Sequence, residues 1–217
     1  MGARDQVMFV LQVVAALGPI AVYFLGLGLV NSQARPFLIS ARRDFSLLAG
    51  AFIPLILVPT AGLAENGHGY LSLAVLASVL VLFVIMLPPR RGVWVVYNVG
   101  PEQLFGLLQR ACRRQKWSIA VEGDLFTIRP AGLQISRHSI HWLRNATLEL
   151  RGPGLHDSAA VGLLAALREE LARESMLASP TGASLVVVGA SLLGLPMWYL
   201  FHHMDLIVDL VRQILFA

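Results

Sequence analysis

Residues 70–88 read YLSLAVLASVLVLFVIMLP and contain no charged side chain. After Pro89, this run is followed by Arg90 and Arg91. A helix of about 20 apolar residues is long enough to cross the hydrocarbon core of a bilayer, where no water is available to solvate a polar group. The stretch therefore predicts a membrane-spanning helix, and it decides the fold class.

Three further stretches meet the same condition, at residues 7–30, 46–64 and 183–201. The last one carries Trp198 and Tyr199 near its end, and such aromatic side chains suit the interface between lipid and water. The whole chain is 56% hydrophobic and only 14% charged, whereas soluble proteins average about 25% charged residues. The sequence thus predicts a membrane α-helical protein with four transmembrane helices.

The first apolar stretch has a second interpretation, because a cleaved signal peptide is also apolar. Residues 7–30 are longer than a typical signal core, however, and residues 31–35 offer no convincing small-residue cleavage site. Gly2 is not followed by Ser or Thr at position 6, as N-myristoylation requires. We therefore expect a retained helix without a lipid anchor.

The distribution of basic residues predicts the orientation. The connection between the first two spans carries Arg35, Arg42 and Arg43, and the segment between the third and fourth spans carries twelve basic residues against eight acidic ones. Connections rich in Arg and Lys stay in the cytoplasm. We therefore expect a multi-pass protein of the bacterial inner membrane, with residues 89–179 in the cytoplasm and both termini outside.

The chain has a formal net charge of +4, and attraction between its basic residues and anionic lipid on the cytoplasmic side explains this excess. Arg42, Arg43, Arg90 and Arg91 border the predicted spans on the cytoplasmic side, where anionic lipid headgroups attract basic residues. We expect these four side chains to contact anionic lipid. Nucleic acid is not an expected partner.

Residues 89–179 have the composition of a soluble domain, and about ninety residues can bury a modest core. Val93 to Val99 reads as a strand. Pro101 suits the first position of a following helix, whose apolar residues recur at helical spacing. These are Leu104, Leu107, Leu108, Ala111 and Cys112. We therefore expect Cys112 to be a core residue, and its surroundings in the sequence lack the spacing of a zinc or iron-sulfur site.

Two hairpins are predicted next. A turn at Glu122-Gly123 pairs Trp117 with Ile128 and Ile119 with Phe126. A second hairpin joins residues 139–143 to residues 146–151 through a turn at residues 143–145, which pairs Trp142 with Ala146 and Ile140 with Leu148.

A final helix begins near Asp157 or Ser158, either of which can cap it. One side of this helix carries Val161, Leu164, Leu167 and Leu171. The predicted insert is therefore a two-layer α+β domain with four or five mostly antiparallel strands.

The tail after the fourth span predicts an amphipathic helix. Asp205, Asp209, Arg212 and Gln213 share one face. The apolar face offers Leu206, Leu210, Val211, Ile214 and Phe216 as candidate docking residues. Such a helix lies along the outer interface or docks on a neighbouring subunit, and its few basic residues favour docking.

The predicted organisation is three transmembrane helices within residues 1–88, a cytoplasmic domain at 89–179, a fourth transmembrane helix at 180–201 and an outer interfacial helix at 202–217.

No catalytic motif is present: the chain lacks a phosphate-binding loop, a nucleophile elbow, an HExxH motif and a kinase signature. His138 and His141 are three residues apart on a predicted strand, so they point to opposite faces. His68, His202 and His203 are candidate metal ligands at the outer side. The sequence identifies no cofactor, and a non-catalytic protein is favoured.

The spans themselves lack ionisable residues, which argues against proton or ion coupling by this chain alone. They are rich in small residues that permit close helix approach, either within the bundle or with a partner. These are Gly18, Gly26, Gly28, Gly50, Ala51, Gly62, Gly189, Ala190 and Gly194.

We therefore expect a non-catalytic subunit that anchors, scaffolds or stabilises a larger membrane complex of the respiratory, photosynthetic, secretion or transport class. Its partners would be membrane lipids and other membrane protein subunits. One alternative is a small-molecule or lipid transporter component, with a cavity near the midplane where Pro19, Pro54, Pro59 and Pro196 break helices. Another is a membrane-bound enzyme or sensor that uses a site around Arg137, His138 and His141.

Overall fold

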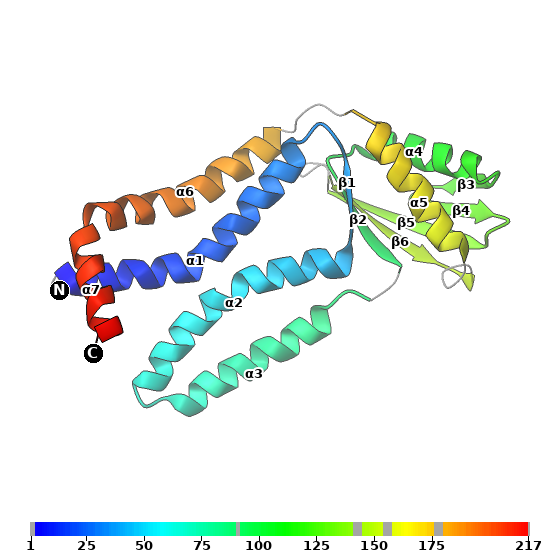
Figure 1. Cartoon of the computed structure of the whole chain (residues 1–217). Helices are drawn as coiled ribbons and strands as arrows, with labels where there is room; N and C mark the ends of the chain where they lie inside the picture. The colour runs from blue at the N-terminus through cyan, green and yellow to red at the C-terminus, as the bar shows by residue number, and fades with distance from the viewer. Residues whose placement is uncertain (1–2, 90–91, 141–144, 154–157, 176–179, 217) are drawn as a thin grey trace. The chain divides into compact units, whose positions relative to one another are not determined.

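A computed structural model describes residues 3–89, 92–140, 145–153, 158–175 and 180–216 (Figure 1). The chain divides into two compact units. The membrane unit comprises Met1–Gly26, Leu47–Met86 and Leu185–Ala217, and the sheet unit comprises Leu27–Ser46 and Leu87–Ser184.

Four helices are long and apolar enough to span a membrane, as the sequence predicts. They are α1 (Ala3–Ser32), α2 (Ala41–Glu65), α3 (Gly69–Met86) and α6 (Pro180–His202). The short helix α7 (Met204–Phe216) follows α6 directly. Three of the four long helices extend beyond the apolar stretches that predicted them, because polar residues continue the hydrogen-bonded turns at their ends; α3 alone ends earlier, at Met86.

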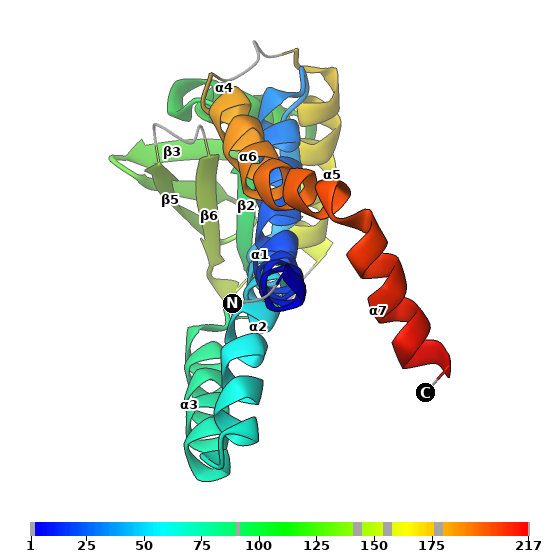
Figure 2. The ribbon, with the colours of Figure 1, turned by 90° about the vertical axis from the view of Figure 1, so that its left-hand side faces the viewer.

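Within the membrane unit, α1 and α6 form an antiparallel pair (Figures 1 and 2). Gly189 of α6 lies so close to α1 that a Cβ atom there would be 2.8 Å from the carbonyl oxygen of Ala21. Further along the pair, Gly18 faces Leu193, and the hydroxyl of Tyr199 donates a hydrogen bond of 3.0 Å to Gln6 Oε1. Glycine permits this backbone approach because it has no side chain.

The other glycines of the spans behave differently. A Cβ atom at Gly26, Gly50, Gly62 or Gly194 would meet nothing within 4 Å. The small residues therefore divide into one group that packs helices within the chain and another whose faces no described residue of the chain occupies.

The membrane helices bury little of their surface within the chain. In the most apolar window of each helix, the buried share is 28% for α1, 11% for α2, 6% for α3 and 11% for α6. Ser72 is the one buried residue of α3. Most of the apolar surface of these helices is thus available to lipid or to other proteins.

The sheet unit contains a six-stranded antiparallel sheet in the order β1-β2-β6-β5-β4-β3. Its strands are β1 (Phe37–Ser40), β2 (Val93–Tyr97), β3 (Ser118–Glu122), β4 (Leu125–Arg129), β5 (Leu133–Ile140) and β6 (Asn145–Arg151). Two helices, α4 (Pro101–Arg114) and α5 (Ser158–Arg173), pack on one face of the sheet.

The edge strand β1 is not part of the predicted domain, because it comes from the connection between α1 and α2. It pairs with β2 in a register that places Leu38 opposite Val96. Four residues are too short a stretch to show strand periodicity, so the sequence predicts no strand there. The sheet therefore combines two segments that are separated in the chain by α2 and α3.

The core lies between the sheet and the two helices. The predicted apolar face of α4 is fully buried, and this includes Cys112. On α5, the predicted face was partly wrong, because Val161 is 70% exposed. Leu163, Leu167 and Leu171, spaced four residues apart, form the buried row instead.

The first hairpin differs from its predicted register. Ile119 faces Ile128, and the turn is Gly123-Asp124 and not Glu122-Gly123. Gly123 has a φ of +61°, which suits the first central position of a type II′ turn. When the turn moves by one residue, the partner of each strand residue changes by two positions. Residues two apart lie on the same face of a strand, so the apolar residues remain on the predicted face.

The second hairpin also has a different register. Ile140 faces Asn145, where the prediction placed it opposite Leu148. Strand β5 begins earlier than predicted, at Leu133, and its buried residue Ile135 lies opposite Leu150. This longer apolar alternation determines the pairing. Residues 141–144 lie outside the described residues, and they include Trp142 and the first two residues of the predicted turn at 143–145.

A small second cluster covers the other face of β1 and β2. Ala41, Val95 and Tyr97 are buried there. They pack with Leu27, Val30, Ile39 and Val93. Leu27 and Val30 belong to the last turns of α1, which form part of the sheet unit.

Candidate functional site

The charged residues between α4 and α5 form an ion-pair network. Glu170 has a side chain that is 8% exposed, and its two carboxylate oxygens accept from Arg110 Nε at 3.1 Å and Arg114 Nε at 2.7 Å. Glu174 and Glu169 extend the network to the same two arginines. Every charge in this cluster has a partner, so the cluster joins two helices and presents no unused group for chemistry.

Arg137, expected in a possible enzyme or sensor site, has a structural role. Its guanidinium donates to Asp124 Oδ1 at 2.7 Å and to the carbonyl oxygen of Pro101 at 3.0 Å. It also lies 5.6 Å from the centre of the Phe126 ring. These contacts fix the start of α4 to the hairpin. His138 is exposed, and His141 lies outside the described residues.

The candidate metal ligands are not brought together. Nδ1 of His202 lies 3.0 Å from the carbonyl oxygen of Trp198, and Nδ1 of His203 lies 3.0 Å from that of Tyr199. His68 is exposed in the connection between α2 and α3. Among the residues that the structure describes, no group of three or more His, Cys, Asp or Glu side chains is arranged to hold a metal ion.

The predicted docking and lipid-contact residues are placed in part. The tail forms a helix, and Leu206 in it is half-buried. The side chains of Leu210, Val211, Ile214 and Phe216 lie outside the described residues, as do Arg90 and Arg91. Arg42 and Arg43 lie in the first turn of α2, and Arg43 is exposed.

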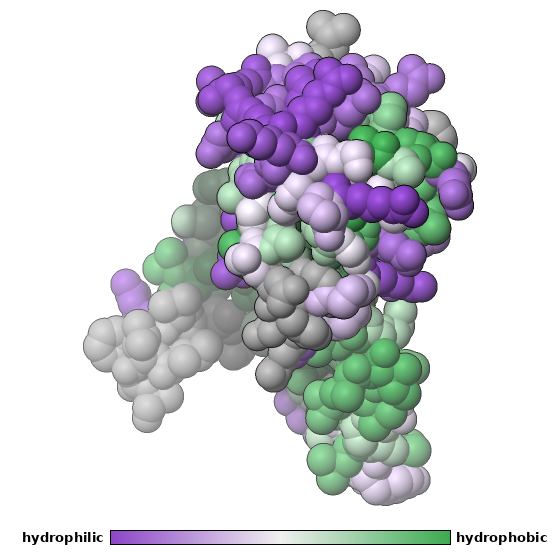
Figure 3. Space-filling model, turned by 90° about the vertical axis from the view of Figure 1, so that its right-hand side faces the viewer, coloured by the Kyte–Doolittle hydropathy of each residue, from purple (hydrophilic) through white to green (hydrophobic). Residues whose placement is uncertain are grey.

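Hydrophilic and hydrophobic residues occupy different parts of the surface. Figure 3 shows hydrophilic residues gathered over the helices of the sheet unit and hydrophobic residues over α2 and α3. The exposed apolar side chains of α3 include Leu80, Val84, Ile85 and Met86.

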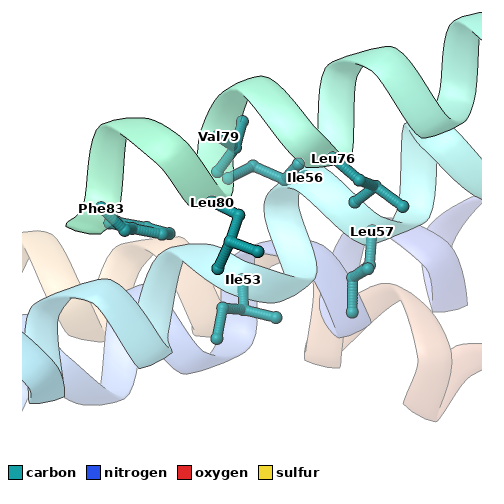
Figure 4. A pocket seen from close by; sticks show the side chains of 7 residues that line it. All are labelled: Ile53, Ile56, Leu57, Leu76, Val79, Leu80 and Phe83. Atoms are coloured by element: carbon teal, nitrogen blue, oxygen red, sulfur yellow. The ribbon is translucent and has the colours of Figure 1, made fainter. Parts of the chain in front are cut away.

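A groove lies between α2 and α3, with a volume of about 160 Å³ (Figure 4). Three side chains of α2 and four of α3 line it. They are Ile53, Ile56, Leu57, Leu76, Val79, Leu80 and Phe83. The α2 residues lie at Pro54 and Pro59, the two prolines within that helix. These two prolines were the feature of the sequence that pointed to this region.

A buried polar cluster between the end of α1 and the end of β2 had no such signal. Asn98 is fully buried with a φ of +56°, and its Nδ2 donates a hydrogen bond of 2.6 Å to the carbonyl oxygen of Gln33. Three buried oxygens, Asn31 Oδ1, Ser32 Oγ and Asn98 Oδ1, have no hydrogen-bond partner among the residues that the structure describes. Water commonly satisfies such groups.

Cys112 is fully buried in the core of the sheet unit. Burial raises the pKa of its thiol to about 11, because a thiolate is poorly solvated there. Since the thiolate is the reactive form, this residue is unreactive at neutral pH.

The chain was compared with protein-family models, curated proteins and solved structures, and none of them matches it.

Proposed function

We propose that this chain is a non-catalytic integral membrane subunit that anchors and stabilises a larger membrane protein complex. The observation that carries the proposal is the unused set of glycines Gly26, Gly50, Gly62 and Gly194, where an added Cβ would meet nothing within 4 Å. Small residues in membrane helices favour close contact with another helix.

The pair of α1 and α6 provides the comparison within the same chain. At Gly189, the approach of α1 leaves no room for a side chain. The four unused glycines offer a similar bare backbone on surfaces that no described residue of the chain covers. Another subunit, or a second copy, would complete the packing.

The low burial of α2, α3 and α6 is consistent with this proposal. It does not carry the proposal alone, because lipid tails also cover apolar side chains and no hydrophobic driving force acts between helices in a bilayer.

The sheet gives the proposed subunit its geometry. Since β1 and β2 pair, the two connections that supply them belong to one folded unit. If α2 and α3 both cross the membrane, these connections lie on the same side, as the basic residues of both segments predict for the cytoplasm. The sheet unit would then be tethered at the membrane surface and be available to a partner.

Purification of the tagged full-length chain in a mild detergent tests the proposal. We expect other membrane proteins, or further copies, to co-purify and to be cross-linked to it. A lone monomer with no cross-linked partner would contradict the proposal.

Variants of one unused glycine sharpen this test. Gly50→Leu is expected to reduce partner recovery about tenfold without changing the thermal unfolding of the isolated chain, because the side chain would enter empty space in the chain. Gly50→Ala is the matched control, since it keeps the position small and should retain the partner. Equal recovery with both variants would remove Gly50 from the interface.

The groove between α2 and α3 favours a second candidate function, a component of a lipid or small-molecule transporter. Reconstitution of the purified chain into vesicles distinguishes the two. Movement of a fluorescent lipid between leaflets, above that of protein-free vesicles, would favour the transporter.

A further inference from the structure

We propose that the groove between α2 and α3 binds the distal half of one phospholipid acyl chain. The proposal concerns a bound hydrocarbon ligand and depends neither on a partner subunit nor on lipid movement across the membrane.

The chemistry of the lining selects hydrocarbon. All seven side chains in Figure 4 are aliphatic or phenyl groups without a hydrogen-bond donor or acceptor. A headgroup, a sugar or a peptide bond placed there would lose its hydrogen bonds to water, which costs several kcal/mol for each group. A methylene chain loses nothing by entering.

The depth of the groove in the bilayer selects the distal part of the acyl chain. At a rise of about 1.5 Å per residue, the lining residues of α2 lie roughly 12–18 Å from Glu65, and those of α3 lie roughly 10–21 Å from Gly69. The hydrocarbon core of a bilayer is about 30 Å thick, so its midplane is about 15 Å from either surface. The groove therefore brackets the depth at which acyl chains end.

The two prolines of α2 help to explain why a groove forms beside this helix. Pro54 and Pro59 lie within the continuous helix α2. Neither has an N–H group, and the ring of each crowds the preceding turn, which favours a bend of the helix beside α3 at this level. Thr60 Oγ1 donates to the carbonyl oxygens of Ile56 and Leu57, at 2.9 and 3.0 Å. These bonds stabilise the helical turn that contains Pro59.

The size of the groove and its accessibility suit a bound segment of a lipid acyl chain. Its volume of about 160 Å³ is similar to the roughly 150 Å³ of an engineered apolar cavity that binds benzene or xenon. Ile53, Leu57 and Leu80 are 44%, 47% and 64% exposed, so the groove is accessible from its surroundings. Around a spanning helix, those surroundings are acyl chains, and an empty groove would forfeit their dispersion contacts.

Photolabelling of the full-length chain in phospholipid vesicles tests the proposal. Two phosphatidylcholine probes carry a diazirine either near the terminal methyl or near the glycerol ester. We expect the terminal probe to label residues 53–57 and 76–83 at least fivefold more than the ester-proximal probe.

Two variants with the same new side chain provide the control. Leu80→Trp places an indole in the groove and is expected to reduce labelling of residues 53–57 at least fivefold. Leu73→Trp lies on the same helix, at a side chain that is 69% exposed and outside the groove, and should label like the unchanged chain. Protection of Cys112 from alkylation verifies that each variant is folded.

Three outcomes would overturn the proposal. Equal labelling by both probes would indicate contact without a defined depth. Unchanged labelling in Leu80→Trp would show that the lipid is not in the groove. Protein–protein adducts at residues 53–57 in place of lipid adducts would assign the groove to a second copy of the chain.

Discussion

At the scale of single residues, Cys112 makes stability depend on pH. The raised pKa, about 11 against an ordinary 9.0, means that the unfolded chain releases the thiol proton at lower pH than the folded chain. The contribution of the thiol to folding stability should therefore be complete below pH 9 and be lost as the pH rises to 11, by about 2–3 kcal/mol.

Denaturant unfolding of the full-length chain in detergent, measured between pH 8 and 11, checks this expectation. Cys112→Ala lacks the titrating group, so the difference in unfolding free energy between the two chains isolates the contribution of the thiol. Parallel pH profiles for both chains would contradict the assignment.

Glu170 is the second residue whose role can be measured alone. Glu170→Gln removes the charge that two arginines share, and we expect it to lower the free energy of unfolding by about 1–2 kcal/mol. The figure is below that of a fully buried pair because Arg110 and Arg114 are 48% and 34% exposed, so water screens them in part.

The matched control for this substitution is Glu174→Gln, which removes one contact at a side chain that is 36% exposed. It should cost less than about 0.5 kcal/mol. Since Cys112 is the one cysteine of the chain, its alkylation rate in denaturant reports the opening of the core. Equal effects of both variants would mean that the burial of Glu170 contributes nothing.

At the scale of elements, the sequence predicted best where one strong signal is local. The four long apolar helices and α4 were predicted correctly, because twenty apolar residues in a row, or Pro101 followed by a regular apolar stripe, need no knowledge of neighbouring elements. The hairpin registers and the face of α5 were wrong in detail, since side-chain packing across the core decides them. Strand β1 was missed because its partner β2 lies more than fifty residues away in the chain.

The candidate site shows the same division. Of the four prolines at which the sequence predicted broken helices around a cavity, Pro54 and Pro59 lie beside the groove, and all four lie within continuous helices. The role of Arg137 was not predictable, because its partners Asp124 and Pro101 are brought to it only by the fold.

The pairing of α1 with α6 yields a prediction at this scale. Gly189→Leu forces a side chain against the carbonyl oxygen of Ala21, and backbone cannot move aside as a flexible side chain can. We expect a loss of about 1–3 kcal/mol of stability, measured as thermal unfolding in detergent. Gly194→Leu, on the same helix but facing open space, should leave unfolding unchanged; equal losses would refute close packing at Gly189.

At the scale of the whole molecule, the sheet constrains how the chain is threaded. In a Cys112→Ala background, Ile39→Cys and Val95→Cys face each other across β1 and β2, so mild oxidation should join them by a disulfide. Leu38→Cys with Val95→Cys is the control, because these residues point to opposite faces of the sheet. Only the first pair should cross-link.

Sidedness follows from the same pairing and the count of spans. If α2 and α3 each cross the membrane, the connection between them lies opposite the sheet. In whole cells without native Cys112, an impermeant maleimide should label His68→Cys and leave Glu122→Cys unlabelled until the cells are lysed; both side chains are exposed, so access and not burial decides the result. The reverse pattern would invert the orientation. Labelling of both in intact cells would mean that α2 and α3 do not each cross, because one sheet cannot be threaded through the bilayer.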